Sequence, residues 1–267
     1  MGITNLCIRF YTTYLKSMFE YRLAALTDIF TNIIIYSATY LGIWILLDRF
    51  QVIQGWTLYE VMFLFNLNMV SYGLSSFIIR WPMLGMEQMV QRGEFDIVLI
   101  RPMNPLLYII LRRPIHAYIG HMILGTIVFV ICFANLDIQW TLIKALFLVF
   151  TIMGAVLIHS TMYLIIGTLS FWIVRTYSVF STLMGSFRHF IDYPISIYGK
   201  VIQALLTFVI PFAFVNFYPA QYFLDRKGDT LFHPILQYGT PVVGIVLFLL
   251  ALKFWTIGVN RYESTGS

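Results

Sequence analysis

The chain has 267 residues, of which 60% are hydrophobic and 11% are charged. Soluble domains are about 45–50% apolar and about 25% charged, so this composition excludes an ordinary soluble fold and predicts an all-α membrane protein that crosses the bilayer several times. The formal net charge is +5, but the basic residues occur singly or in pairs beside apolar runs, not in the long basic runs that bind nucleic acid.

The segment before the first long apolar run has an apolar residue at every fourth position. Leu6, Phe10, Tyr14 and Met18 follow this spacing, with charged residues between them. The pattern is typical of an amphipathic helix that lies in the membrane interface. We therefore expect an interfacial elbow helix ahead of the first span.

The apolar runs predict six transmembrane helices. A helix rises about 1.5 Å per residue, so about 20 apolar residues cross a hydrocarbon core about 30 Å thick. No stretch between the runs is long enough for a soluble domain, and we expect residues 1–267 to form a single membrane domain. The six expected spans are residues 23–47, 58–79, 115–134, 142–166, 194–211 and 236–257.

The second span begins with a capping-box sequence. Thr57 is followed three residues later by Glu60, and this pair satisfies free backbone N–H groups in the first turn of a helix. We expect a helix to start directly after Trp56.

The same span carries four polar side chains at i, i+3, i+4 and i+7, from Asn68 to Ser75, which places them on one face, and Asn66 lies beside that face. Hydrogen bonds to a neighbouring helix are one explanation. The alternative is a face that lines a translocation path or a subunit interface. The residues are Asn66, Asn68, Ser71, Tyr72 and Ser75.

The connection between spans two and three is charged and interrupted by prolines. Residues 86–91 can form a short helix, Gly93 stops it, and Pro102 and Pro105 stiffen the return to the membrane. A short helix of mixed charge suits docking to a soluble partner. The alternative is a loop that only joins two spans, with the apolar residues 97–100 on the lipid surface.

Two later regions depart from a simple span pattern. Residues 140–172 are too long for one upright span and too short for two, so we expect one helix that projects past Gly167. In residues 210–229, Pro211 and Pro219 interrupt an aromatic-rich stretch. Irregular backbone at membrane depth must be covered by protein, and we expect a broken helical element on the outer side between spans five and six.

The distribution of Lys and Arg predicts the orientation. Thirteen of them, including Arg188, are assigned to the side of the N-terminus and four to the other side. Because basic residues concentrate on the cytoplasmic side, both termini and the connection between spans two and three are expected in the cytoplasm.

No motif for catalysis or for a cofactor is present. The chain has no Walker A sequence, no zinc-binding His-Glu-x-x-His and no Cys-x-x-Cys, so we expect neither a metal site nor enzymatic activity. Asp28 is the one acidic candidate inside a span. A small ion-coupled carrier that depends on Asp28, or a membrane-embedded enzyme, are the alternatives that stay open.

The connection between spans two and three also carries a specific motif, Gly-x-Phe-Asp-x-x-Leu-x-Arg-Pro. With the stretches 14–22, 55–61, 193–200 and 210–224, it resembles the permease subunits of bacterial ABC-2 type exporters. The residues of the motif are Gly93, Phe95, Asp96, Leu99, Arg101 and Pro102.

This resemblance implies a non-catalytic subunit in the bacterial cytoplasmic membrane, surrounded by lipid. It implies two partners: an ABC ATPase that binds ATP and Mg²⁺, and a second permease, either the same chain or a related one. It also implies that the connection between spans two and three contains a cytoplasmic coupling helix seated on the ATPase. The expected coupling residues are Glu87, Gln88, Arg92, Gly93, Glu94, Phe95, Asp96, Arg101 and Pro102.

Overall fold

The fold is that of a computed structural model, which describes residues 12, 16, 19–112, 118–173, 175–226 and 231–263. Within these ranges the chain is mostly helical and contains no β-strand. The long helices are α2 (Arg22–Phe50), α3 (Leu58–Ser75), α8 (Ile119–Asn135), α9 (Leu142–Leu169), α10 (Thr176–His189) and α13 (Thr240–Asn260). The shorter elements are η1 (Ser76–Arg80), α4 (Trp81–Leu84), α5 (Met86–Gln91), α6 (Glu94–Leu99), α7 (Pro105–Arg112), η3 (Ile195–Ile197), α11 (Lys200–Ala204), η4 (Leu205–Val209), η5 (Phe212–Phe214), α12 (Phe217–Phe223) and η6 (Pro234–Tyr238).

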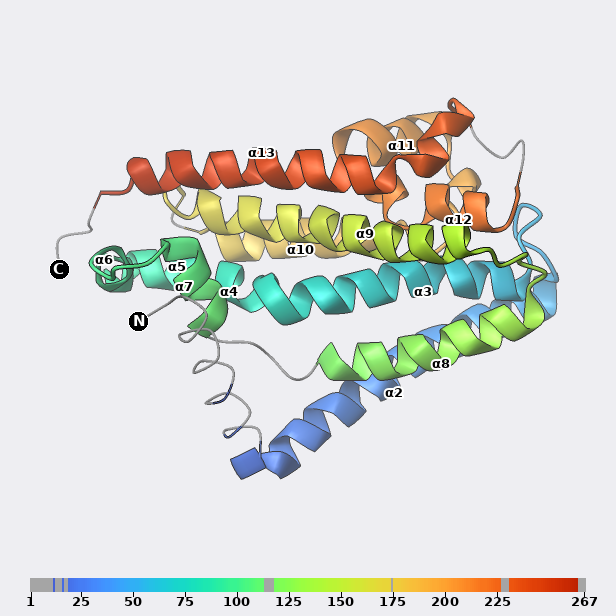
Figure 1. Cartoon of the computed structure of the whole chain (residues 1–267), viewed down its shortest axis with the longest axis horizontal. Helices are drawn as coiled ribbons and strands as arrows, with labels where there is room; N and C mark the ends of the chain where they lie inside the picture. The colour runs from blue at the N-terminus through green and yellow to red at the C-terminus, as the bar shows by residue number, and fades with distance from the viewer. Residues whose placement is uncertain are drawn as a thin grey trace.

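The long helices lie side by side in an elongated bundle (Figure 1). Most side chains of α3 are buried, because this helix packs against α2, α8 and α9. α13 packs along α9, which also contacts α10. Helices α5, α6 and α7 lie at one end of the bundle, here called the α6 end, while α12 and the α2–α3 connection lie at the opposite α12 end.

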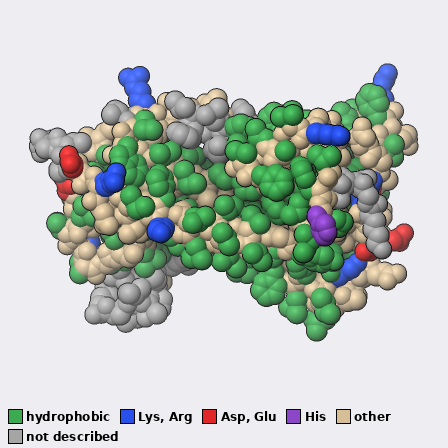
Figure 2. Space-filling model, turned by 90° about the horizontal axis from the view of Figure 1, so that it is seen from above, with side chains coloured by type: hydrophobic (Ala, Val, Ile, Leu, Met, Phe, Trp, Pro, Cys, Tyr) green, Lys and Arg blue, Asp and Glu red, His purple; other side chains and the backbone are tan. Residues whose placement is uncertain are grey.

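The surface of the bundle is largely apolar. α2, α9 and α13 each expose large hydrophobic side chains, among them Ile45, Leu146 and Leu249. Figure 2 shows hydrophobic side chains over much of one face, with acidic side chains only near its two ends. Such an apolar belt between polar ends suits a protein surrounded by lipid.

Four helical stretches are long and apolar enough to cross a membrane, namely α2, Leu58–Gln91, α9 and α13. A fifth crossing is available if the bent pair Lys200–Val209 and Phe212–Phe223, which meet at 81°, forms one span. α8 is apolar but only 17 residues long. The all-helical, multi-pass prediction is confirmed, and so is the single long helix α9 of 28 residues; the count of six spans stays a prediction.

The expected fifth span, residues 194–211, is not a continuous helix. It contains the 3₁₀ helix η3, then extended backbone at Gly199, then α11 and the π-helix η4. The chain bends at Pro211, whose ring fixes φ and removes an N–H donor. Pro219 does not interrupt the backbone, because it lies in the first turn of α12, where a proline is tolerated. That this element faces the outer side stays a prediction.

The capping box of α3 forms as predicted. Glu60 Oε2 accepts hydrogen bonds from Thr57 N at 2.7 Å and from Thr57 Oγ1 at 2.9 Å. The same oxygen lies 2.9 Å from Arg226 Nη1, and the Arg226 guanidinium sits 4.5 Å from the centre of the Trp56 ring. These contacts fasten the start of α3 to the segment that follows α12. The predicted elbow helix with Leu6, Phe10, Tyr14 and Met18 lies outside the described residues.

α9 and α13 approach each other closely at two glycines. A Cβ added to Gly244 would lie 2.3 Å from the carbonyl oxygen of Gly154, and one added to Gly154 would lie 2.6 Å from the carbonyl oxygen of Thr240. Small residues allow the backbones of membrane helices to touch in this way. The two helices are therefore in backbone contact across their crossing point.

Candidate functional site

Most of the expected coupling residues lie in a pair of short helices at the α6 end, and Arg101 and Pro102 follow it. Its first helix, α5, has the predicted bounds Met86–Gln91. Gly93 adopts a left-handed conformation with φ 66°, which glycine accepts at little cost, so the chain turns there between α5 and α6. α6 follows directly, although the sequence predicted no helix at this position. We call Met86–Leu99 the α5–α6 hairpin.

Phe95 anchors α6 in the bundle. Its side chain is fully buried, and its ring centre lies 5.0 Å from that of Phe171 and 4.9 Å from that of Tyr262. Trp255 of α13 completes the cluster at 6.3 Å. Because Phe171 lies two residues past the end of α9, this aromatic cluster joins α6 to both α9 and α13.

Glu87 joins the other half of the hairpin to α10. Its Oε2 accepts a hydrogen bond from the backbone N–H of Tyr177 at 2.6 Å and one from the Thr176 hydroxyl at 3.3 Å. These residues form the first turn of α10, whose own N-cap, Arg175, provides no side-chain cap. A carboxylate at a helix N-terminus satisfies free N–H groups and complements the helix dipole.

The outward face of the hairpin combines charge with apolar surface. Gln88, Arg92 and Ile100 are exposed, the last with 81% of its surface accessible. A cavity of about 140 Å³ lies beside α5 and includes Gln88, Arg92 and Glu94 in its lining. The remaining predicted coupling residues are distributed as follows: Asp96 is partly buried, while Arg101 and Pro102 are exposed beyond the end of α6.

The predicted polar face of α3 is buried in the bundle. Asn66 accepts a hydrogen bond from Tyr40 Oη at 2.7 Å and donates one to the Gly125 carbonyl at 3.0 Å. Ser75 Oγ lies 2.9 Å from Ser160 Oγ of α9, and Ser71 bonds to carbonyls of its own helix. Asn66 and Ser75 thus form helix-to-helix hydrogen bonds, as one of the two explanations expects.

Tyr72 faces a different environment, a central cavity of about 240 Å³ between α3, α9 and α10. The Arg188 guanidinium lies 3.8 Å from the centre of the Tyr72 ring, and Arg80 lies 5.9 Å from it. Arg80 ends η1, a π-helical turn, and such turns are frequent at functional sites. The lining residues are Tyr72, Arg80, Leu84, His159, Met162, Tyr163, Ile166, Gly185, Arg188, His189 and Phe212.

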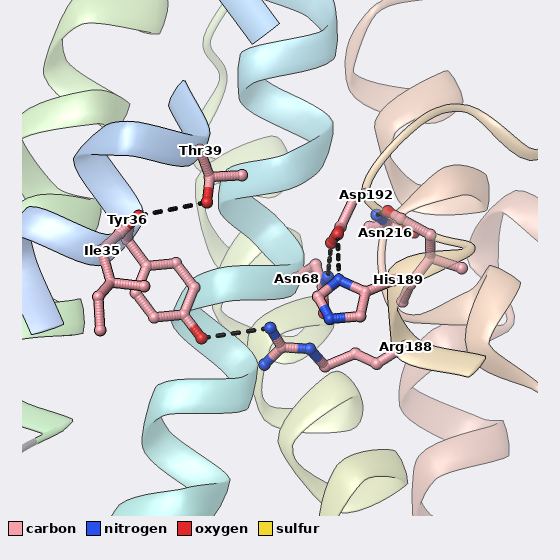
Figure 3. Close-up of polar contacts among 9 residues, drawn as sticks. Ile35, Tyr36, Thr39, Asn68, Arg188, His189, Asp192 and Asn216 are labelled. Carbon is pink, nitrogen blue, oxygen red and sulfur yellow. Dashed lines mark hydrogen bonds and ion pairs between the residues drawn. The ribbon is translucent and has the colours of Figure 1, made fainter. Parts of the chain in front are cut away.

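Arg188 differs most from its sequence prediction. Counting charges assigns it to the cytoplasmic face, but its Nη2 donates a hydrogen bond to Tyr36 Oη at 3.2 Å, beside the middle of α2 (Figure 3). α10, which the sequence did not reveal, carries Arg188 into the bundle; the side of the membrane to which it belongs stays a prediction. Four residues later, Asp192 accepts hydrogen bonds from Asn68 and His189.

The two remaining chemical predictions concern Asp28 and metal binding. Asp28, on which the ion-coupled alternative depends, is exposed near the start of α2, away from the lining of the central cavity. Among the described residues, no group of three or more His, Cys, Asp or Glu is arranged to hold a metal ion.

Comparison with protein families identifies the chain. The family model described as ABC-2 family transporter protein matches residues 33–266, which include the hairpin and every residue that lines the central cavity. The chain is a member of the ABC-2 transporter family. No curated protein and no solved structure gave a significant match. This ABC-2 permease is thus a multi-pass membrane protein of a family whose permeases generally are non-catalytic subunits that work with an ABC ATPase.

Proposed function

We propose that the chain is the permease subunit of an ATP-driven exporter, coupled to a separate ATPase through the α5–α6 hairpin. It forms half of the translocation path and pairs with a second permease, either a copy of itself or a related chain. ATP and Mg²⁺ bind to the ATPase, and both termini of the permease lie in the cytoplasm of a bacterial cell, whose cytoplasmic membrane holds the complex.

The main support for the proposal is that the hairpin contacts the bundle at two separate places. Glu87 joins α5 to the start of α10, whereas Phe95 joins α6 to α9 and α13. α9 and α10 both line the central cavity. A force applied to the hairpin therefore acts on two walls of that cavity through different contacts.

The exposed face of the hairpin supports docking to a soluble protein. Ile97 and Leu99 are exposed at 53% and 41%, and Ile100, which directly follows the hairpin, at 81%. The exposed cations Arg92 and Arg101 flank these residues in the sequence. Interface centres favour apolar and Arg side chains, with polar residues at the rim. This mixture suits a groove on a partner ATPase better than a loop that only joins two spans.

Charge reversal on the hairpin tests the proposal. The variant Arg92→Glu, Glu94→Lys, Asp96→Lys is expected to abolish permease-stimulated ATP hydrolysis in a reconstituted complex, because the docking face then repels its partner. The control Asp48→Lys, Arg49→Glu reverses charges at the far end of α2 and should leave stimulation unchanged. Helix content from circular dichroism must match that of the wild type in both. Full stimulation in the hairpin variant contradicts the proposal.

A further inference from the structure

The lining of the central cavity contains two arginines, Arg80 and Arg188. Among the described residues, neither Arg80 nor Arg188 forms an ion pair with a carboxylate. Their neighbours are aromatic: Tyr72 and Tyr118 for Arg80, Tyr72 and Tyr36 for Arg188. A cation–π contact offsets only part of the free energy that burying a charge costs, so the aromatic neighbours compensate the two guanidinium charges only in part.

Asp192, the acidic residue of this region, forms its hydrogen bonds with residues other than the two arginines. Asp192 Oδ2 lies 2.7 Å from His189 Nδ1, and Asp192 Oδ1 accepts a hydrogen bond from Asn68 at 3.3 Å. Figure 3 shows Asp192 beside His189 and Asn68, while Arg188 points away toward Tyr36. Asp192 attracts Arg188 over a longer range, but its oxygens form hydrogen bonds with His189 and Asn68 and not with either guanidinium group.

A second, independent observation indicates a ligand. His159 lines the cavity, is only 3% exposed, and its Nε2 has no hydrogen-bond partner. Buried polar atoms nearly always have a partner, and an exception needs an explanation. A ligand oxygen or a bound water that bridges to it would satisfy this nitrogen.

The size and lining of the cavity limit what it can bind. Its volume of about 240 Å³ is below the roughly 300–1,000 Å³ of pockets that enclose drug-sized molecules. Leu84, Met162 and Ile166 supply apolar walls beside the two cations. These dimensions suit a small acidic headgroup and the beginning of an apolar chain.

We propose that Arg80 and Arg188 bind the phosphate or carboxylate headgroup of an amphipathic anion that the permease carries. That the permease transports this anion rests on the proposed function. Binding of the anion to the two arginines does not. Arginine suits the role because its planar guanidinium donates paired hydrogen bonds to such oxyanions. The other titratable groups of the site are the lining residues Tyr72, His159, Tyr163 and His189, and Asp192, which is bonded to His189.

Direct binding to the purified full-length permease in a neutral detergent tests the site. Dodecyl phosphate is compared with dodecylphosphocholine, which has the same chain but no net charge. We expect dodecyl phosphate to bind more tightly, and Arg80→Gln or Arg188→Gln to weaken it about tenfold or more, as expected when a hydrogen bond between charged groups is lost. Arg49→Gln, an exposed control at the end of α2, should bind like the wild type.

Two further probes separate the possible sources of the oxyanion. Competition by inorganic phosphate supports recognition of the headgroup alone, and competition by dioleoylphosphatidylglycerol, with no effect of inorganic phosphate, supports a lipid headgroup. If Arg188→Gln does not fold, Arg80→Gln and Arg188→Lys are used to test the site. Arg188→Lys keeps the positive charge and should weaken binding less than a change to glutamine. Equal binding of both dodecyl compounds, or wild-type affinity in the folded glutamine variants, overturns the proposal. The measurement needs no ATPase, so its outcome is separate from that of the charge-reversal experiment.

Discussion

Glu87 of α5 accepts a hydrogen bond from the backbone N–H of Tyr177 at 2.6 Å and so caps the first turn of α10. A residue of the hairpin therefore stabilises the start of a helix that carries Arg188 near its other end. The contact connects the proposed docking surface with the wall of the central cavity.

Replacement of Glu87 by alanine should loosen the start of α10. The loss of a helix cap costs about 0.5–2 kcal/mol, so amide hydrogen exchange in residues 176–180 should accelerate severalfold while the rest of the bundle stays protected. Glu87→Gln, which keeps an acceptor oxygen, should have a smaller effect. Glu94→Ala removes the same charge from the hairpin without this contact, and equal acceleration in that variant would show that the cap is unimportant.

Phe95→Ala should detach α6 from the bundle. The change removes a buried ring that packs on Phe171 and Tyr262, and such truncations cost about 3–5 kcal/mol. We expect a lower thermal unfolding midpoint and weaker stimulation of the ATPase. Ile97→Ala, at an exposed position of the same helix, tests whether the stability loss depends on burial; it should leave the midpoint near that of the wild type.

Gly244→Ala should separate α9 from α13. The added methyl group would lie 2.3 Å from the Gly154 carbonyl oxygen, and overpacking of this kind costs about 1–3 kcal/mol. The unfolding midpoint in detergent should fall. Gly42→Ala is the matched control, because a Cβ at Gly42 meets no atom within 4 Å. A similar midpoint for both variants would mean that the contact between the two helices is not tight.

The orientation can be measured with single cysteines in a Cys7→Ser background, in which Cys132 is buried. Ile100→Cys at the α6 end and Val52→Cys at the α12 end replace residues that are 81% and 50% exposed. A membrane-impermeant maleimide should label position 52 in intact spheroplasts and position 100 only in inverted vesicles, as the distribution of basic residues predicts. The opposite pattern would place the hairpin outside the cell and exclude its contact with an ATPase.

Local sequence signals predicted several elements well. The bounds of α5 followed from a short polar helix stopped by Gly93, and the start of α3 followed from Thr57 and Glu60. Both signals act within a few residues of the backbone that they shape. The length of α9 was predictable for the same reason, since an apolar run without Pro propagates as one helix.

The environment of Arg188 could not be predicted in this way. Its partners, Tyr36 and Tyr72, lie on helices more than a hundred positions earlier in the chain, so no local pattern reveals them. α10 is rich in Ser and Thr and is too polar to stand out as a span. Counting charges then assigns its arginine to a membrane surface, whereas tertiary packing provides an aromatic site in the interior.

Since not even a methyl group fits between Gly154 and Gly244, α9 and α13 cannot roll over each other without first coming apart. We therefore expect the pair to move as one rigid body, and the contact between Phe95 and Trp255 joins α6 to it. Rearrangements of the permease must then take place along the boundary between this body and its neighbours α3 and α10. The central cavity lies on that boundary, with His159 and Met162 of α9 on one side and Tyr72 and Arg188 on the other.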